Sequence, residues 1–248
     1  MDNRRQTECN QARLNCRSAK EKDKVNILSF PQSCIVDRVV PKNMFYKFME
    51  VNPRMKARFV NDVVSITWLY KLSAQSLNVT SSDNMLEIEV FVAALKGPDC
   101  PPDLFAFIDC NMPHHIVFIL TYEDNAMLLI NYKDWTDNTH TKFKITQTFT
   151  SPWVKIQDIQ LPVQGQSLNR IYDNFVASVS GIGEHKAGSM AEIVELKQRI
   201  AKMESELNAL QIKVRKEKQF NIQMEMNKQV KTKRKELAAL KEELEKLK

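Results

Sequence analysis

Glycine is scarce in this chain, and no long hydrophobic run interrupts it. Five glycines and nine prolines in 248 residues are too few for an all-β protein, which needs many tight turns. No apolar stretch approaches the ~20 residues that a helix needs to span a bilayer. The chain opens with MDNRRQTECNQARLNC, which is polar throughout and does not resemble a signal peptide. We therefore expect a soluble protein without a membrane segment.

Cysteine is also used sparingly, and its spacing excludes the common cysteine sites. The five residues are Cys9, Cys16, Cys34, Cys100 and Cys110, an odd number that contains no Cys-x-x-Cys pair. Zinc knuckles and redox-active dithiols both need such pairs. Unpaired thiols suit a reducing compartment, so we predict a cytoplasmic protein.

The familiar catalytic motifs are missing as well. The chain has no glycine-rich phosphate loop and no Gly-x-Ser-x-Gly turn. A restriction-type nuclease needs an Asp followed by Glu-x-Lys on the next strand, where the carboxylates hold Mg²⁺. The nearest match is Glu87-Ile88-Glu89, which has no Lys at the required place, while Asn131-Tyr132-Lys133 has an amide in place of the carboxylate. Asp62 and Asp109 would complete such a site only through geometry that the sequence does not reveal.

Histidine and lysine give no clear site either. His114 and His115 are adjacent, and neighbouring residues on a strand point to opposite faces, so we expect one satisfied and one exposed imidazole rather than a metal site. Lys71 and Lys133 follow apolar strands, where we expect their stems to lie along the sheet with the charge in water. A pair of lysines contacting phosphate from one sheet face is the alternative. We predict that the protein is not an enzyme and has no catalytic residue, cofactor or metal ion.

What the chain does contain is a composition typical of globular proteins, with 43% hydrophobic and 27% charged residues. Its net charge of +6 mildly favours an acidic partner such as nucleic acid. Four segments follow from composition and patterning. They are a polar, flexible N-terminal arm (1–28), a globular domain (29–180), a glycine-containing linker (181–190) and a helical coiled-coil arm (191–248).

The globular domain mixes two hydrophobic periods, which predicts an α+β fold with a mostly antiparallel sheet and flanking helices. Alternating or continuous apolar runs predict strands, and the last two central runs are joined by Glu-Asp-Asn as a hairpin. Helical spacing, with caps at Asn52 and Ser167, predicts the helices. Strands are expected over 65–73, 85–95, 114–122, 126–133 and 142–149, and helices over 44–51, from 53 onward, near 101–109 and over 168–179.

The C-terminal arm carries two hydrophobic stripes at coiled-coil spacing. With Phe220 between them, we predict that they bind a partner. The residues of this predicted partner-binding surface are Ile193, Leu196, Ile200, Met203, Leu207, Leu210, Val214, Phe220, Met226, Val230, Leu237, Leu240, Leu244 and Leu247.

The two stripes are out of phase, because the second register sits two residues later than the first predicts. One continuous parallel coiled coil is therefore not expected. Either the halves fold back on each other, or one long helix presents each stripe to a different surface. The connection 215–225 lacks Gly and Pro, which favours the long helix. Self-association through either stripe stays open.

Basic residues crowd the middle of the arm, where only Glu217 and Glu225 are acidic. These basic residues are suited to contact a phosphate backbone. The alternative is that they form a solvated face or pair with an acidic surface of a protein partner. Phe220, Ile222 and Met224 lie among them, which favours protein docking. The candidate nucleic-acid-binding residues are Lys213, Arg215, Lys216, Lys218, Lys228, Lys231, Lys233, Arg234 and Lys235.

Several segments together resemble the bacterial and archaeal domain-of-unknown-function 4391 family over residues 29–248. These segments are FPQSCIVDRVVPKNMFY, FVNDVVSITWLYKLSAQSLNV, LEIEVFVAALK, HHIVFILTY with INYK, and RKEKQFNIQMEMN. The resemblance implies genes for restriction or anti-phage helicases and DNA methyltransferases as neighbours. It implies no catalytic residues.

We therefore predict a non-catalytic adaptor that docks through its coiled-coil arm onto a larger DNA-processing assembly of restriction or anti-phage type. The expected partner is a helicase or methyltransferase subunit. A direct nucleic-acid-binding protein that uses residues 213–235 is the first alternative. A divergent Mg²⁺-dependent nuclease is the second.

Overall fold

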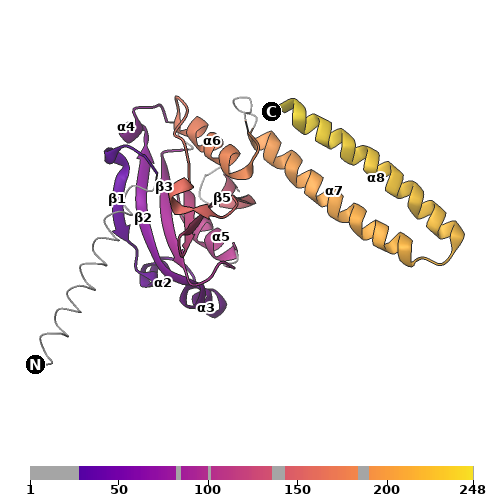
Figure 1. Ribbon diagram of the computed structural model, residues 1–248, viewed down its shortest axis with the longest axis horizontal. Coiled ribbons are helices and arrows are strands. Elements are labelled where there is room, and N and C mark those ends of the chain that lie inside the picture. The colour runs from indigo at the N-terminus through magenta and orange to yellow at the C-terminus, as the bar shows by residue number, and fades with distance from the viewer. Residues whose placement is uncertain (1–27, 82–84, 100–101, 136–142, 184–189, 248) are drawn as a thin grey trace, which may run out of the picture. The chain divides into compact units, whose positions relative to one another are not determined.

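The computed structural model describes residues 28–81, 85–99, 102–135, 143–183 and 190–247. The predicted N-terminal arm, apart from Leu28, and most of the predicted linker lie outside these residues. The chain divides into two compact units, Met1–Val179 and Ser180–Lys248 (Figure 1).

The first unit is built on a mixed sheet, in which seven strands take part among the described residues. Six strands follow the order β1-β2-β3-β4-β5-β6, and β7 pairs with β5. Neighbouring strands are antiparallel except β3 and β4, which are parallel and joined through helix α5. The strands are β1 (Ile35–Val39), β2 (Val63–Ser73), β3 (Glu87–Leu95), β4 (His115–Tyr122), β5 (Asn125–Trp135), β6 (Phe143–Thr150) and β7 (Val154–Lys155).

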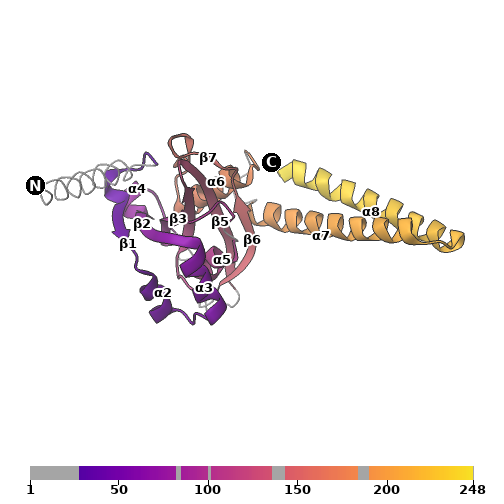
Figure 2. The ribbon, with the colours of Figure 1, turned by 60° about the horizontal axis from the view of Figure 1, so that its bottom comes forward.

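Helices cover both faces of the sheet (Figure 2). One core joins Phe45, Phe59 and Phe105 from three helices to the facing side chains of β2, β3 and β4. On the opposite face, α6 places Tyr172 against His115 of β4, with ring centroids 4.6 Å apart. The helices of this unit are α2 (Lys42–Phe48), α3 (Pro53–Asp62), α4 (Ala74–Leu77), α5 (Asp103–Cys110) and α6 (Leu168–Ser180), with short 3-10 turns at Gln32–Cys34 and Ile156–Asp158.

This architecture confirms the predicted α+β class with a mostly antiparallel sheet. Asn52 caps α3 by accepting a hydrogen bond from the Met55 amide at 2.8 Å, and Phe59 is fully buried on its inner face. The β4–β5 hairpin turns at Glu123 and Asp124 as predicted, with Glu123 in the left-handed region. The amphipathic stripe of α6 is buried as its spacing predicts.

The sequence reasoning missed β1 and β7. Strand β1 is an edge strand whose register shifts between Ile35 and Arg38, and Asp37 has a φ of 46°. Its last three residues are exposed, so it shows no alternation of buried and exposed positions. Strand β7 has two residues, too few to show a period.

Strand β3 is buried on both of its faces, so its polar residues are not on a solvent-exposed face. Phe91 and Ala93 face the core under α2, α3 and α5, and Ile88 and Val90 are fully buried on the other side. Both faces of a strand in a parallel pair are commonly covered in this way. Glu89 is therefore drawn into the interior, which the sequence pattern did not indicate.

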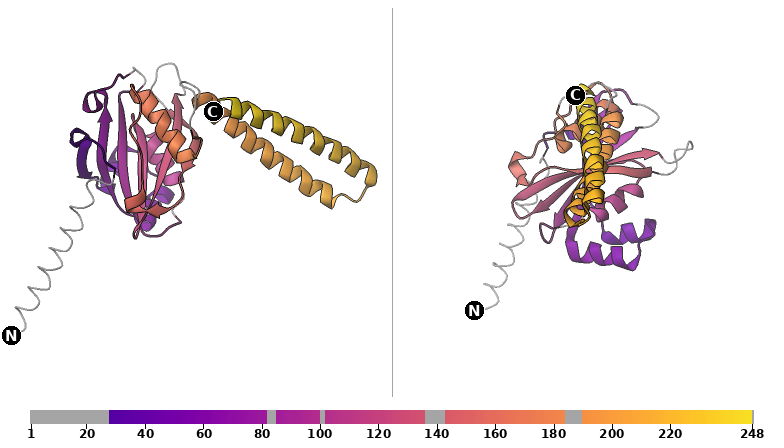
Figure 3. Two further views of the ribbon diagram at one scale, coloured as in Figure 1. Left: turned by 45° about the horizontal axis from the view of Figure 1, so that its top comes forward. Right: turned by 90° about the vertical axis from the view of Figure 1, so that its right-hand side faces the viewer.

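The second unit is an antiparallel helical hairpin of α7 (Met190–Lys216) and α8 (Phe220–Leu247), seen in Figures 1 and 3. The preference for one long helix was therefore wrong, and the fold-back arrangement is observed. Within the hairpin, Lys241 pairs with Glu204 at 2.7 Å. Lys233 of α8 pairs with Glu206 of α7 at 2.6 Å.

The hairpin turns without glycine or proline because two side chains form hydrogen bonds to backbone groups at the turn. The Glu217 carboxylate accepts a hydrogen bond from the Gln219 amide at 2.8 Å. The Gln223 side chain donates to the Val214 carbonyl across the hairpin at 3.2 Å. Three residues, 217–219, therefore connect the helices, where eleven were expected.

No helix in the described parts of the chain has the length and apolar character that crossing a membrane requires.

Candidate functional site

The hydrophobic stripes of the arm lie on the inner faces of the hairpin. All predicted partner-binding residues except Phe220 are buried or half-buried, while most residues between them are exposed. Lys233 occupies one stripe position, and its ammonium group reaches Glu206 at 2.6 Å and the Met203 sulfur at 3.8 Å. Each stripe thus serves the hairpin itself. Binding of another protein by these stripes stays a prediction.

The tip of the hairpin exposes apolar side chains instead. Phe220 is 73% exposed, and Met224, one turn further along the same face of α8, is 49% exposed. Ile212 of α7 and Ile222 of α8 are exposed as well. Exposed aromatic and methionine side chains are typical of protein-binding surfaces. We call Ile212, Phe220, Ile222 and Met224 the hairpin tip.

The candidate nucleic-acid-binding residues surround the hairpin tip and continue along α8. Eight of them are exposed, whereas Lys233 is half-buried and paired with Glu206. Lys228 lies 3.4 Å from Glu225 on the same exposed face. The basic segment is thus accessible except at Lys233.

A second group of titratable side chains gathers where β2, β3 and β4 meet in the first unit. The Glu87 carboxylate lies 2.6 Å from the Lys71 ammonium group of β2 and 3.7 Å from His114 Nε2. Glu89 is paired in register with Lys71 across the β2–β3 ladder. One ligand atom from each of Glu87, Glu89 and His114 lies within 4.8 Å of the other two. We call these three residues the carboxylate–histidine cluster.

Glu89 is the most deeply buried member of this cluster, with 4% of its surface exposed. Burial first, and then the nearby Glu87 carboxylate, raise the pKa of Glu89 to about 7, although Trp68 and Lys71 act to lower it. Among the residues that the structure describes, none supplies a hydrogen bond to Glu89 Oε2. A buried acceptor of this kind normally has a partner.

His114 and His115 point to different surroundings, as their adjacency on a strand predicts. His115 is buried between Tyr172 and Phe143, and burial, helped by Lys133 and His114, lowers its pKa to about 3. His114 is half-buried near Glu87, and burial lowers its pKa despite that carboxylate. Both imidazoles are therefore neutral at pH 7.

A buried polar network next to the cluster holds the loop that carries His114. The side chains of Lys133 and Asp109 are fully buried and lie 2.7 Å apart. Lys133 also donates to the carbonyls of Asp109, Met112 and His114, at 3.0, 3.2 and 2.6 Å. The Asn131 amide donates to Asp109 at 3.0 Å and accepts from Thr148 at 2.7 Å. The network ties the end of α5 and the 112–114 loop to β5.

Burial acts on both partners of this ion pair. It raises the pKa of Asp109 to about 6, while Lys133 and the Asn131 amide lower it. It also lowers the pKa of Lys133, which the Asp109 carboxylate raises. Each charge therefore depends on the other. The expectation that the Lys133 ammonium group reaches water was wrong, and so was the alternative of a phosphate contact by Lys133.

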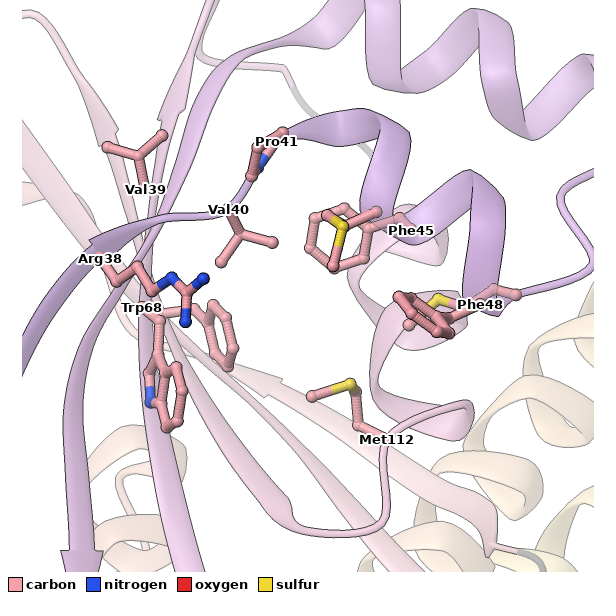
Figure 4. Close-up of a pocket in the computed structure, with 11 residues that line it drawn as sticks. Arg38, Val39, Val40, Pro41, Phe45, Phe48, Trp68 and Met112 are labelled. Carbon is pink, nitrogen blue, oxygen red and sulfur yellow. The ribbon is translucent and has the colours of Figure 1, made fainter.

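An apolar hollow of about 420 Å³ lies on the same sheet face, between β1, α2 and the loop at Met112 (Figure 4). Phe48 and Val39 at its rim are exposed, and Trp68 and Phe91 line it with their rings stacked at 6.3 Å. Trp68 also contributes a hydrogen bond to Glu89. Trp68 therefore belongs both to the lining of the hollow and to the surroundings of Glu89.

The structure brings together residues that the sequence reasoning considered separately. Lys71, Glu87 and His114 come from three different segments, and their proximity depends on the pairing of β2, β3 and β4. The search for a lysine two residues after a glutamate failed because the lysine near Glu89 belongs to the neighbouring strand. Asp62 lies at the other end of these strands, since Val63 pairs with Leu95.

The chain was compared with known families, curated proteins and solved structures. The model of a protein family described as "Domain of unknown function (DUF4391)" matches residues 28–237. No curated protein and no solved structure matches the chain.

Proposed function

The chain belongs to the DUF4391 family, and because that family's description carries no activity, we propose a function from the molecule's own surface. We propose that the protein is a non-catalytic accessory subunit that docks onto a larger assembly through its helical hairpin. The assembly is a DNA-processing one of restriction or anti-phage type, with a helicase or methyltransferase subunit as the partner that the family resemblance implies.

The observation that carries this proposal is the exposure of Phe220 at the hairpin tip. A phenylalanine that is 73% exposed at the start of α8 contributes little burial to the fold of the hairpin. Met224 extends the apolar surface on the same face of α8, and Ile212 and Ile222 are further exposed apolar side chains near the turn. Lys213, Arg215 and Lys216 border it with positive charge. An apolar centre with a charged rim is the usual anatomy of a protein interface.

The hairpin seam supports the same proposal in a different way. Because the stripes of α7 and α8 cover each other, the hairpin is a stiff support that presents its tip rather than its sides. The ion pairs Lys233–Glu206 and Lys241–Glu204 hold the two helices in register. Binding energy in protein interfaces is concentrated in a few aromatic and basic residues. We therefore place the docking energy in Phe220 and its basic rim.

The test is co-purification of a tagged chain from its native cells. We expect a stoichiometric partner that the double variant Phe220→Ser, Met224→Ser loses by at least ~10-fold, as for interface residues worth ~2 kcal/mol. The matched control is Val60→Ser, which removes an exposed apolar side chain from α3 of the first unit. Equal recovery of the partner by all three proteins, or elution of the wild type alone, would contradict the docking function.

Direct binding of nucleic acid is the second candidate, and the basic segment favours it. Residues 213–235 contain nine basic and two acidic residues, and all the basic side chains except Lys233 are exposed. A groove or helix lined in this way attracts phosphate backbones regardless of sequence.

A further inference from the structure

The carboxylate–histidine cluster has the donor set of a cation site. Glu87 and Glu89 project from the same face of β3, because they are two residues apart on a strand. His114 reaches them from the residue before β4, which pairs with β3 from Ile88 and His115 onward. The three ligand atoms lie within 4.8 Å of one another, close enough for small side-chain rotations to bring them around one ion.

Glu89 provides the independent observation that this cluster needs a ligand. Its side chain is 96% buried, and no described residue donates a hydrogen bond to Oε2. A second carboxylate, Glu87, faces it at short range and repels its charge. A buried carboxylate oxygen beside another carboxylate costs folding free energy unless a proton shared by the two carboxyl groups or a bound cation compensates it.

The surroundings hold these donors in place. Lys133 binds the His114 carbonyl at 2.6 Å, so the loop that carries the imidazole is fixed from within the core. Trp68 hydrogen-bonds Glu89. Metal sites depend on such supporting contacts to orient their ligands.

We propose that Glu87, Glu89 and His114 form a binding site for one divalent transition-metal cation of the Mn²⁺ or Zn²⁺ class. An imidazole nitrogen suits these ions, whereas Mg²⁺ and Ca²⁺ prefer oxygen ligands alone. Three protein ligands leave coordination positions for water or another ligand. The site is independent of the hairpin tip, so it stands or falls separately from the docking function.

The positive charge of Lys71 partly neutralises the Glu87 carboxylate, as a bound cation would. Its ammonium group lies 2.6 Å from Glu87, and its side chain is 40% exposed, so it can swing into solvent. A cation that binds Glu87 must displace this ion pair. Removing Lys71 should therefore tighten cation binding, whereas a purely structural Glu87–Lys71 pair predicts no such gain.

The test uses the full-length chain, stripped of metal with EDTA and titrated with MnCl₂. Mn²⁺ is the main probe because Zn²⁺ also binds free thiols, such as that of the exposed Cys110. Loss of the free Mn²⁺ paramagnetic resonance signal, together with calorimetry, should show one ion per chain. Addition of Mn²⁺ or Zn²⁺ should also raise the thermal unfolding temperature.

Two ligand variants and two controls make the assignment specific. Glu89→Gln keeps the shape of the side chain and should weaken Mn²⁺ binding at least ~10-fold, which even supporting residues of metal sites cause when removed. His114→Gln, at a half-buried position, should do the same. Glu50→Gln, which changes an exposed carboxylate elsewhere in the first unit, should bind as the wild type does. Lys71→Met should bind several-fold more tightly.

The unfolding temperature in EDTA shows whether each variant is folded. If Glu89→Gln does not fold, the Mn²⁺ affinity of His114→Gln decides whether the cluster binds the ion. The proposal is overturned if the wild type binds neither Mn²⁺ nor Zn²⁺ with defined stoichiometry. It is also overturned if the folded ligand variants bind Mn²⁺ as tightly as the wild type. Equal affinity for Mg²⁺ and Mn²⁺ would overturn the assignment to transition metals.

Discussion

At the scale of single residues, the polar groups inside the first unit are its most informative feature. Lys133 contributes an ion pair to Asp109 and three hydrogen bonds to backbone carbonyls, all within the core. Buried ion pairs gain little over apolar packing, but breaking one leaves an uncompensated charge. The cluster next to this network depends on it, because Lys133 holds the His114 loop.

Replacement of Lys133 by Met should therefore lower the free energy of unfolding by ~3–5 kcal/mol. The loss should be larger at pH 8 than at pH 5. Burial raises the pKa of Asp109 from its unfolded value of 3.8 to about 6 even with Lys133 in place. The variant removes Lys133, which lowers this pKa more than Asn131 does, so the pKa rises further. At pH 5, Asp109 of the folded variant is neutral. At pH 8 it must either ionise inside the core or keep a proton that the unfolded chain releases, and both lower the free energy of unfolding. Denaturant unfolding at both pH values measures this.

The matched control is Lys71→Met, which removes a half-exposed lysine with one ion pair and should cost less than ~1 kcal/mol. A loss at Lys133 as small as this would mean that the buried pair contributes no more than a surface pair.

The same residues show where sequence reasoning reaches its limit. Glu87, His114 and Lys71 were each noticed, but which strands are neighbours cannot be read from one chain. The burial of Glu89 was missed because a glutamate in an alternating strand is expected to face water. The burial of Lys133 was missed because a charged residue after an apolar strand is also expected to reach water. Its buried partner, Asp109, lies on a helix 24 residues away in sequence, so the pairing cannot be read from the local pattern.

At the scale of elements, strong periodic patterns in the sequence were sufficient to place helices and strands, and weak patterns were not. The stripe of α6 and the β4–β5 hairpin have the predicted positions, because many positions in each agree. Strand β1 was missed because its bulge and its exposed end remove the period. The hairpin turn was misjudged because a hydrogen bond from the Gln219 amide to the Glu217 carboxylate replaces the usual glycine.

The hairpin turn gives a prediction at this scale. Glu217→Ala should free the Gln219 amide and speed hydrogen exchange at the start of α8 by ~2–30-fold, the effect of losing a ~0.5–2 kcal/mol cap. Exchange measured by NMR or mass spectrometry over residues 219–223 tests it. Glu217→Gln keeps an acceptor oxygen and should exchange nearly as the wild type does. Equal exchange in all three proteins would show that the turn does not need this hydrogen bond.

At the scale of the whole molecule, charge is distributed unevenly. The net charge of the chain is +6, and residues 213–235 alone hold nine basic and two acidic residues. Basic and acidic residues nearly balance over the rest of the chain. The electrostatic attraction for an acidic partner therefore comes from the hairpin, whether that partner is a protein or a nucleic acid.

For nucleic acid, this distribution predicts a salt-dependent affinity that the hairpin controls. The triple variant Lys213→Glu, Arg215→Glu, Lys216→Glu should bind a short DNA duplex more weakly. It should also reduce the log–log salt slope by up to ~3, or ~0.9 for each phosphate that the variant no longer neutralises. Lys233 is left unchanged because it stabilises the hairpin through Glu206. Fluorescence anisotropy at several salt concentrations measures both quantities.

The control with the same charge change is Arg54→Glu, Lys144→Glu, Lys155→Glu, which alters exposed residues of the first unit. An equal loss of affinity in the control would show that net charge, and not the hairpin, governs binding.

The position of Trp68 has a practical consequence. Its indole lines the apolar hollow and also hydrogen-bonds Glu89, so one natural fluorophore borders two separate environments. An apolar molecule in the hollow would shift its emission to shorter wavelength by excluding water. A paramagnetic ion near Glu89 would quench it. The chain thus carries its own optical reporter, which needs only Trp153→Phe and Trp135→Phe to be read alone.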